Sequence, residues 1–239
     1  MSLSLQSRRV GDISVVKCSG RIVEGDETAA LQRFLNGLLP CDRFIILDLG
    51  QTPFIDSGGL GLLVRFLARF QTAGGNLKLC AVPARIAEVL KITRLASVFE
   101  SHESEADAIA AFYQPTQSAG KAYRFNTEIL CVEKSADVLA YVGALLQQAG
   151  YGVVTTGNLA DARTLLTATQ TQLVVIGAEF RPTRGTPTAE TFNRLANVRS
   201  VVELPADFSS HEAGEAGHRL LDHVRAVLGD RDRPATARP

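Results

Sequence analysis

Short apolar runs alternate with amphipathic helical patterns along almost the whole chain, and this alternation restricts the folds that the chain can adopt. Strand patterns lie at residues 13–18, 44–49 and 76–82 in the first half, and at 129–132, 151–155, 173–176 and 201–202 in the second. Nearly continuous apolar runs of this length are typical of strands that are covered on both faces of a parallel sheet. The order of strands and helices predicts α/β architecture in both halves.

The helical patterns between these runs have the spacing of helices that cover a sheet. In the first half they begin at Asp26, which can cap a first turn, and again after residue 56, at 85–91 and at 105–112. In the second half they lie at residues 137–149, 158–168, 187–196 and 212–228. This second succession predicts a shortened, doubly wound, flavodoxin-like parallel sheet.

A polar segment predicts where the chain divides. Residues 113–124 contain Pro115, Ser118 and Gly120 and almost no aliphatic side chains, which is typical of a linker. We therefore predict a first domain at residues 1–113, a linker at 114–124 and a second domain at 125–229. Residues 230–239 have no apolar face, and we expect them to form a disordered tail.

Charge and composition argue against several classes of protein. Lys plus Arg and Asp plus Glu each number 25, so the chain lacks the excess of basic residues that direct binding to a nucleic-acid duplex requires. The apolar runs are too short to cross a bilayer, and residues 1–12 lack the apolar stretch of a signal peptide. We therefore expect a cytoplasmic protein that binds neither nucleic acid nor membrane.

The sequence offers no recognisable set of residues for catalysis, a cofactor or a metal. Its four cysteines form no CxxC pair, and three of them lie in strand patterns, where we expect small buried side chains. The four histidines lack metal-binding spacing, and no phosphate-binding glycine motif or nucleophile elbow occurs. We therefore predict that the protein is not an enzyme and uses neither cofactor nor metal.

The most informative segment is FIDSGGLGL, residues 54–62, which follows a predicted buried strand and opens a helix. Asp56 or Ser57 stands at the cap, and Gly58 and Gly59 leave the surface around the Ser57 hydroxyl bare. A phosphate there would meet unpaired backbone N–H groups and the positive end of the helix dipole, while Asp56 would either orient the hydroxyl or repel the phosphate. An Asp-Ser pair before a helix is also an ordinary N-cap, so both interpretations stay open.

This segment and its surroundings resemble the STAS family, the anti-anti-sigma factors. The resemblance covers residues 3–112 and includes Gly20-Arg21 before the first helix, LDL at 47–49, the glycine pair at 74–75 and the stretch from 82 to 100. It implies a STAS-type sheet with flanking helices in the first domain.

The resemblance assigns roles to single residues. It makes Ser57 the phosphoacceptor, and its neighbours are Asp56, Gly58, Gly59 and Asp26. Asp26 would match the acid that the family places before the first helix, but the segment here is longer than usual, and Glu24 and Glu27 are alternatives.

The resemblance also implies partners. In this family an anti-sigma factor, a serine kinase of the GHKL type, phosphorylates that serine; the unmodified protein binds the kinase and so frees a sigma factor, and a phosphatase reverses the change. We accordingly expect an anti-sigma factor antagonist that sequesters the kinase until Ser57 is phosphorylated. The alternative is a non-cycling STAS scaffold or ligand-sensing module in a larger bacterial signalling complex.

The predicted helix after Ser57 is apolar around more than half of its circumference. We predict that Leu62 and Phe66, which lie beside its main apolar stripe, contact the partner. Deep burial of this helix within its own domain is the alternative.

The second half resembles a response-regulator receiver that has lost its chemistry. In receivers the first strand is followed by two acids that hold Mg²⁺, whereas here the pair is Glu133-Lys134, and the lysine disfavours a cation. Gly177 stands where the resemblance places the phosphoacceptor aspartate. These departures imply a degenerate receiver without phosphotransfer, shortened by about one strand and one helix. Such a domain could also form a homodimer; an unrelated doubly wound domain is the alternative.

Overall fold

The structure, a computed structural model, describes residues 2–113, 127–180, 200–206, 208 and 213–229. The chain divides into two compact units, Met1–Phe112 and Tyr113–Pro239. The predicted linker at 114–124, the predicted helix at 187–196 and the predicted tail at 230–239 lie outside the described residues. Among the residues that are described, no helix combines the length and apolar character needed to cross a membrane.

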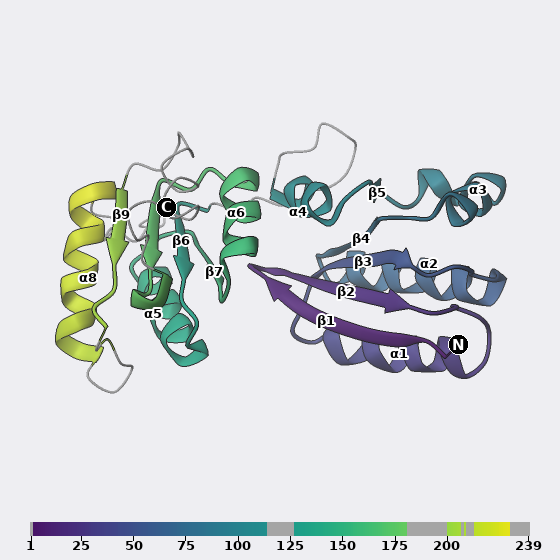
Figure 1. Ribbon diagram of the computed structural model, residues 1–239, viewed down its shortest axis with the longest axis horizontal. Helices are drawn as coiled ribbons and strands as arrows, with labels where there is room; N and C mark the ends of the chain where they lie inside the picture. Colours follow the sequence, from purple (N-terminus) through teal and green to yellow (C-terminus); the bar gives the residue numbers. More distant parts are fainter. Residues whose placement is uncertain (1, 114–126, 181–199, 207, 209–212, 230–239) are drawn as a thin grey trace, which may run out of the picture. The chain divides into compact units, whose positions relative to one another are not determined.

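The first unit is built on a five-stranded sheet (Figure 1). Its strands are β1 (Ser4–Val10), β2 (Ile13–Ser19), β3 (Phe44–Gln51), β4 (Asn76–Cys80) and β5 (Ser101–His102), which lie in this order across the sheet. β1 and β2 are antiparallel, and the pairs from β2 to β5 are parallel. The predicted α/β architecture is therefore confirmed for this unit.

Strand β1 does not follow from the hydrophobic pattern of the sequence. It is an edge strand that pairs with β2, and the side chains of Gln6, Arg8 and Arg9 are exposed. An edge strand with one solvated face can carry polar residues, so it lacks the continuous apolar run that marks a central strand.

Three helices, α1 (Asp26–Leu38), α2 (Ser57–Thr72) and α3 (Ala84–Ile92), share one core with the sheet. Alternate strand residues such as Ile45 and Leu79 are buried in this core together with Leu35 of α1, Phe66 of α2 and Leu90 of α3. Figure 1 shows α1 and α2 side by side along the sheet. Successive strand residues point to opposite faces, so all three helices cover the same face.

Helix α4 (Glu105–Tyr113) packs on the opposite face. The ring of its Phe112 meets the ring of Phe44 edge-on, with 5.5 Å between centroids. Lys78 of β4, which alternates with the core residues Leu77 and Leu79, also lies against Phe112, with its Nζ atom 4.7 Å from the ring centroid. The sheet of the first unit is thus covered on both faces.

Lys78 is a buried charge that the apolar strand pattern did not reveal. Only 2% of its surface is exposed, but its ammonium group forms an ion pair with Glu100 and donates a hydrogen bond of 3.1 Å to the carbonyl oxygen of Ala111. A buried charge is tolerated when it is paired and hydrogen-bonded in this way. The side chain therefore serves the packing of β4 against α4.

We expect Glu100→Ala to destabilise the first unit more than Lys78→Met does. Removing Glu100 leaves a buried ammonium group without its counter-ion, at a cost of about 1–2 kcal/mol, because Glu100 is itself 46% exposed. Methionine fills a similar volume without a charge, so its cost should stay below about 1 kcal/mol. Urea unfolding measures both values; a larger loss for Lys78→Met would contradict this account of the pair.

The second unit contains a four-stranded, all-parallel sheet among its described residues. The strands β6 (Ile129–Val132), β7 (Val153–Thr156), β8 (Leu173–Ile176) and β9 (Ser200–Glu203) lie in the order β7-β6-β8-β9. The prediction of a second parallel sheet with helices is therefore confirmed. The direction of strand succession reverses between β6 and β8, which is the topological switch point of such a sheet.

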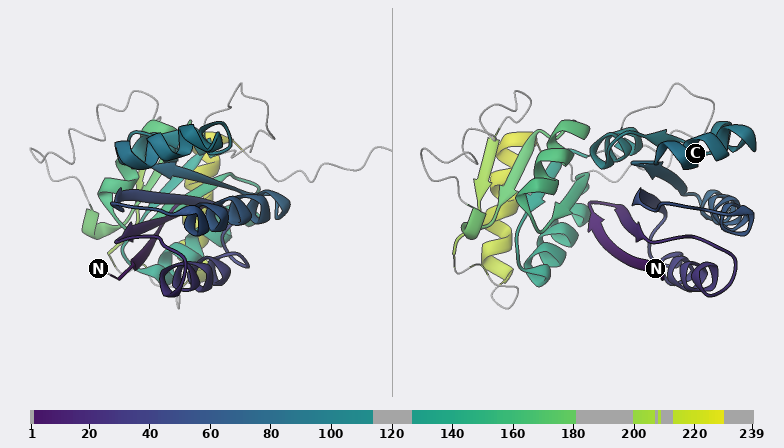
Figure 2. Two further views of the ribbon diagram at one scale, coloured as in Figure 1. Left: turned by 90° about the vertical axis from the view of Figure 1, so that its right-hand side faces the viewer. Right: turned by 45° about the vertical axis from the view of Figure 1, so that its right-hand side comes forward.

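Among its described residues, this unit has the α-helices α5 (Ala136–Gln148), α6 (Leu159–Ala168) and α8 (Ala213–Leu228). α5 and α8 share a core with one face of the sheet, through residues such as Val142 and Val224. α6 contacts β6 and β7. Its Leu165 is buried on the opposite face of the sheet, together with the strand residues that point to that face. Figure 2 shows α8 beside β9, at one edge of the sheet.

Candidate functional site

The loop that leads into α2 is held by a second loop that follows β2. Ile22 and Ile55 form an isolated parallel bridge, in which the Ile22 N–H donates to the carbonyl oxygen of Phe54 at 3.0 Å and the Asp56 N–H donates to that of Ile22 at 3.2 Å. This pairing fixes the direction in which the chain enters the helix. Ser57 is the first residue of α2, and its side chain is exposed.

Asp56 is the residue that caps α2. Its Oδ1 accepts the N–H of Gly59 at 2.8 Å, and its Oδ2 accepts the N–H of Glu24 at 2.9 Å. These hydrogen bonds, first that from Glu24 and then that from Gly59, hold the pKa of Asp56 below its usual value. The carboxylate is therefore charged at neutral pH, directly beside the Ser57 hydroxyl in the chain.

The two glycines after Ser57 are needed because the neighbouring loop comes so close. A Cβ atom at Gly59 would lie 2.6 Å from the carbonyl oxygen of Ile22 and 2.8 Å from Cγ1 of Ile55. A Cβ atom at Gly58 would lie 2.8 Å from Cβ of Glu24. The glycines thus let the helix start pack against the loop, in addition to leaving Ser57 accessible.

Of the three acids considered for the neighbourhood of Ser57, Glu24 is the one whose side chain lies against the start of α2. The structure therefore favours Glu24 over Asp26. Asp26 is also not the cap of α1: the N-cap is Gly25 with φ 122, and Asp26 is the first helical residue. Sequence spacing could not distinguish these acids, because the decisive contact joins residues more than thirty positions apart.

The prediction that Leu62 and Phe66 contact a partner is wrong. Leu62 is 3% exposed and Phe66 is fully buried, and both belong to the core beneath the sheet. The guanidinium group of Arg69 lies 5.1 Å from the centroid of the Phe66 ring. Deep burial of α2, the alternative reading of its wide apolar surface, is what the structure shows.

Phe54 is an exposed aromatic residue near Ser57 that the sequence analysis did not single out. Its side chain is 37% exposed, and the guanidinium group of Arg85 from α3 lies 5.6 Å from its ring centroid. Its position three residues before Ser57 is the signal that could have identified it. An exposed aromatic ring beside an arginine is the composition of many protein contact sites.

In the second unit, the three positions that the receiver resemblance singled out lie at one end of the sheet. Glu133 and Lys134 follow β6, and Gly177 follows the neighbouring strand β8. A Cβ atom at Gly177 would lie 1.7 Å from Oε2 of Glu133, so the Glu133 carboxylate occupies the space that a larger residue at 177 would need. Oε1 of Glu133 accepts the Ser135 N–H at 2.9 Å, while Nζ of Lys134 lies 3.4 Å from Oε2 of Glu179.

Gly177→Ala should weaken the second unit through Glu133. The new methyl group would displace the Glu133 carboxylate and so break its hydrogen bond to Ser135, at a cost of about 1 kcal/mol. Gly157→Ala is the matched control, because a Cβ atom there meets the Glu133 carbonyl oxygen at an ordinary 3.7 Å. In a Glu133→Ala background the Gly177→Ala penalty should vanish. A double-mutant cycle by denaturant unfolding measures this coupling, and a value near zero would refute it.

The described residues contain no group of three or more His, Cys, Asp or Glu side chains arranged to hold a metal. Cys18, Cys80 and Cys131 are buried, as predicted, and burial is the main cause that raises the pKa of each thiol to about 12. These three thiols therefore stay protonated and act as small apolar side chains.

Comparisons with known proteins concern the first unit. A family model described as the STAS domain matches residues 4–108. The protein BtrV of Bordetella bronchiseptica, named as an anti-sigma factor antagonist, is 32% identical over 71 residues, which cover 30% of this chain and 61% of BtrV.

Similar solved structures include an anti-sigma factor antagonist from Mycobacterium paratuberculosis, with 23% identity over 46% of this chain and 93% of that one, and a TM-score of 0.42. Another is the phosphorylated form of SpoIIAA from Bacillus, with 17% identity over 46% of this chain and 100% of that one, and a TM-score of 0.39. Residues 4–108, which contain the five-stranded sheet of the first unit, are therefore assigned to the STAS domain.

Proposed function

We propose that the chain is an anti-sigma factor antagonist whose first unit is a binding switch controlled by phosphorylation of Ser57. The observation that carries this proposal is the position of Ser57, exposed at the first residue of α2 between a capping aspartate and two glycines. Its partners are an anti-sigma factor serine kinase, which it binds in the unphosphorylated form, and a phosphatase that restores that form.

The chemistry of the helix start explains how phosphorylation would change binding. A phosphate adds about −1.5 to −2 charges and would lie near the free N–H groups and the positive dipole end of α2. The Asp56 carboxylate already takes the Gly59 N–H, and Glu24 is exposed nearby. The phosphate would therefore be added to a surface that already bears negative charge. The added negative charge would change the electrostatic interaction of this surface with a partner.

Phosphosite mapping tests this assignment. The chain is purified from its native cells with phosphatase inhibitors, digested and analysed by mass spectrometry, and we expect a phosphopeptide that carries its phosphate on Ser57. The exposed Ser7 of β1 is an internal control that should remain unmodified. A chain that never carries phosphate on Ser57, under conditions that activate and repress its sigma factor, would favour a non-cycling STAS scaffold instead.

For the second unit we propose a receiver-like fold that does not transfer phosphate. The all-parallel order β7-β6-β8-β9 supports the fold, and the Glu133 side chain beside Gly177 supports the loss of chemistry, because an aspartate at 177 would need that space. The chain is incubated with acetyl phosphate and Mg²⁺, and we expect no acyl phosphate. Labelling that survives Ser57→Ala and maps to the second unit would overturn the proposal.

A further inference from the structure

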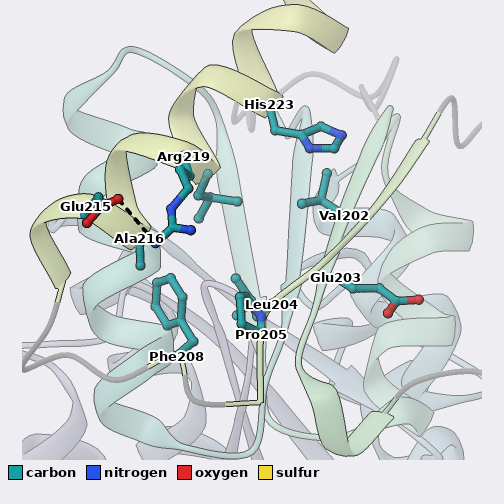
Figure 3. A pocket seen from close by; sticks show the side chains of 10 residues that line it. Val202, Glu203, Leu204, Pro205, Phe208, Glu215, Ala216, Arg219 and His223 are labelled. Carbon is teal, nitrogen blue, oxygen red and sulfur yellow. Dashed lines mark ion pairs between the residues drawn. The ribbon is translucent and has the colours of Figure 1, made fainter.

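The second unit contains an open pocket between the edge strand β9 and helix α8 (Figure 3). Its volume is about 550 Å³, which lies within the size range of small-molecule sites. Three lining residues, Val202 of β9, Leu204 directly after that strand and Leu220 of α8, are buried in the core, and the accessible apolar surface comes from Pro205 and the half-buried Phe208. The chemistry of the known family, which concerns the first unit, makes no use of this pocket.

Two nitrogen-bearing side chains lie over this apolar surface. Arg219 and His223 are four residues apart on α8 and therefore share one face of the helix. Figure 3 shows Arg219 extending toward Phe208 and the His223 ring lying above Val202. Both side chains can donate hydrogen bonds into the pocket, and arginine carries a permanent positive charge.

The two acids that line the pocket, Glu215 and Glu203, do not form a strong ion pair with these donors. Glu215 pairs with Arg219 at 3.7 Å, but both side chains are more than 70% exposed, and an exposed pair of this kind is weak. Glu203 is the last residue of β9 and lies between the buried Val202 and Leu204 in the chain, and in Figure 3 its carboxylate points away from α8. The pocket therefore combines an apolar surface with the hydrogen-bond donors of Arg219 and His223.

The position of the pocket also fits ligand binding. Open α/β sheets bind ligands beyond the carboxyl ends of their strands, most often at the switch point. Here the switch point lies between β6 and β8, and the Glu133 carboxylate fills it beside Gly177. The pocket lies beside the carboxyl end of β9, on the same sheet.

We propose that this pocket binds a small organic anion with an apolar body. The apolar body would lie on Pro205 and Phe208, and the anionic group would take hydrogen bonds from Arg219 and His223, displacing Glu215. Such a site would make the second unit a ligand-binding module. The proposal does not depend on the phosphorylation of Ser57, so either can fail without the other.

Titration of the full chain with 8-anilinonaphthalene-1-sulfonate tests the site, because this probe joins an apolar body to one anionic group. We expect one saturable fluorescent site, which Arg219→Ala weakens by about ten-fold, the loss of one charge-assisted hydrogen bond. Arg163→Ala, which removes an exposed arginine of α6 outside the pocket, should leave binding unchanged. Equal effects of the two variants would overturn the proposal.

Two further measurements test the apolar surface and the need for an anion. Ala216→Trp places an indole in the pocket and should abolish binding while the melting temperature stays that of the wild type. N-phenyl-1-naphthylamine, which lacks the sulfonate, should bind at least about ten-fold more weakly. Equal binding of the two probes would overturn the anion assignment. Sedimentation experiments test a second occupant. If the wild type is a dimer that Ala216→Trp or Arg219→Ala dissociates, the pocket binds a second copy of the chain, and the ligand proposal would be overturned.

Discussion

Gly59→Ala should destabilise the first unit by about 1–3 kcal/mol, the usual cost of forcing extra atoms into a packed site. The new methyl group would meet the Ile22 carbonyl oxygen at 2.6 Å and side-chain atoms of Ile22 and Ile55 at 2.8 Å. Two of these three obstacles are branched side chains in the core and the third is backbone, so relief requires the loop at Ile22 to move. Thermal and denaturant unfolding measure the loss.

The matched control lies two residues further along the same helix. A Cβ atom at Gly61 meets nothing within 4 Å, and the position is exposed. Gly61→Ala should therefore stabilise α2 by about 0.5–1 kcal/mol, the difference in helix propensity between the two residues. If both substitutions shifted stability in the same direction, the close approach of the Ile22 loop would not explain Gly59.

Gly59→Ala should also reduce partner binding, because the displaced loop carries the Glu24 N–H that holds Asp56. Gly61→Ala should leave binding unchanged, since a Cβ atom at Gly61 would meet no atom of that loop within 4 Å.

Ser57→Asp should weaken binding of the anti-sigma factor kinase by about a hundred-fold, because a like-charge contact at an interface costs several kcal/mol. The substitution adds a carboxylate at the exposed first residue of α2, where Asp56 is already ionised and Glu24 lies close. Ser57→Ala keeps the unmodified charge and should change the Kd by less than about three-fold. Isothermal titration of the kinase that co-purifies with the chain measures both.

Ser7→Asp is the control for charge alone, since it adds the same carboxylate at an exposed position on β1. It should bind as the wild type does. If Ser57→Asp and Ser57→Ala both bound with wild-type affinity, Ser57 would not be a switch, and the scaffold interpretation would gain support.

The α/β architecture of both units could be predicted because their central strands are buried on both faces. Residues 44–49 and 173–176 are nearly all apolar for that reason, and the structure makes them parts of β3 and β8. β1 escaped prediction because the side chains of an edge strand face solvent. Hydrophobic periodicity reports burial, so a strand whose side chains are mostly exposed leaves little such signal.

The candidate site could be predicted in part. The cap at the start of α2 follows from local sequence, and Asp56 fills it. The contact of Glu24 with Gly58 and the burial of Leu62 and Phe66 depend on segments that are distant in sequence. Periodicity showed that α2 is apolar on most sides, but it could not show that its own domain covers those sides.

The same limit applies to the second unit. The replacement of the expected acids by Lys134 and Gly177 is visible in the sequence. That the Glu133 side chain fills the space beside Gly177 follows only from the pairing of β6 with β8. Sequence alone therefore predicted lost chemistry, and the structure adds the position of the Glu133 carboxylate beside Gly177.

The most direct test of the switch is to incubate the purified chain with its kinase and ATP and to follow phosphorylation and complex formation together. We predict one phosphoryl group per chain, located on Ser57, and dissociation of the complex in step with its addition. Ser57→Ala should take up no phosphate and should remain bound. Phosphate on another residue, or a complex that persists when Ser57 is fully phosphorylated, would contradict the account.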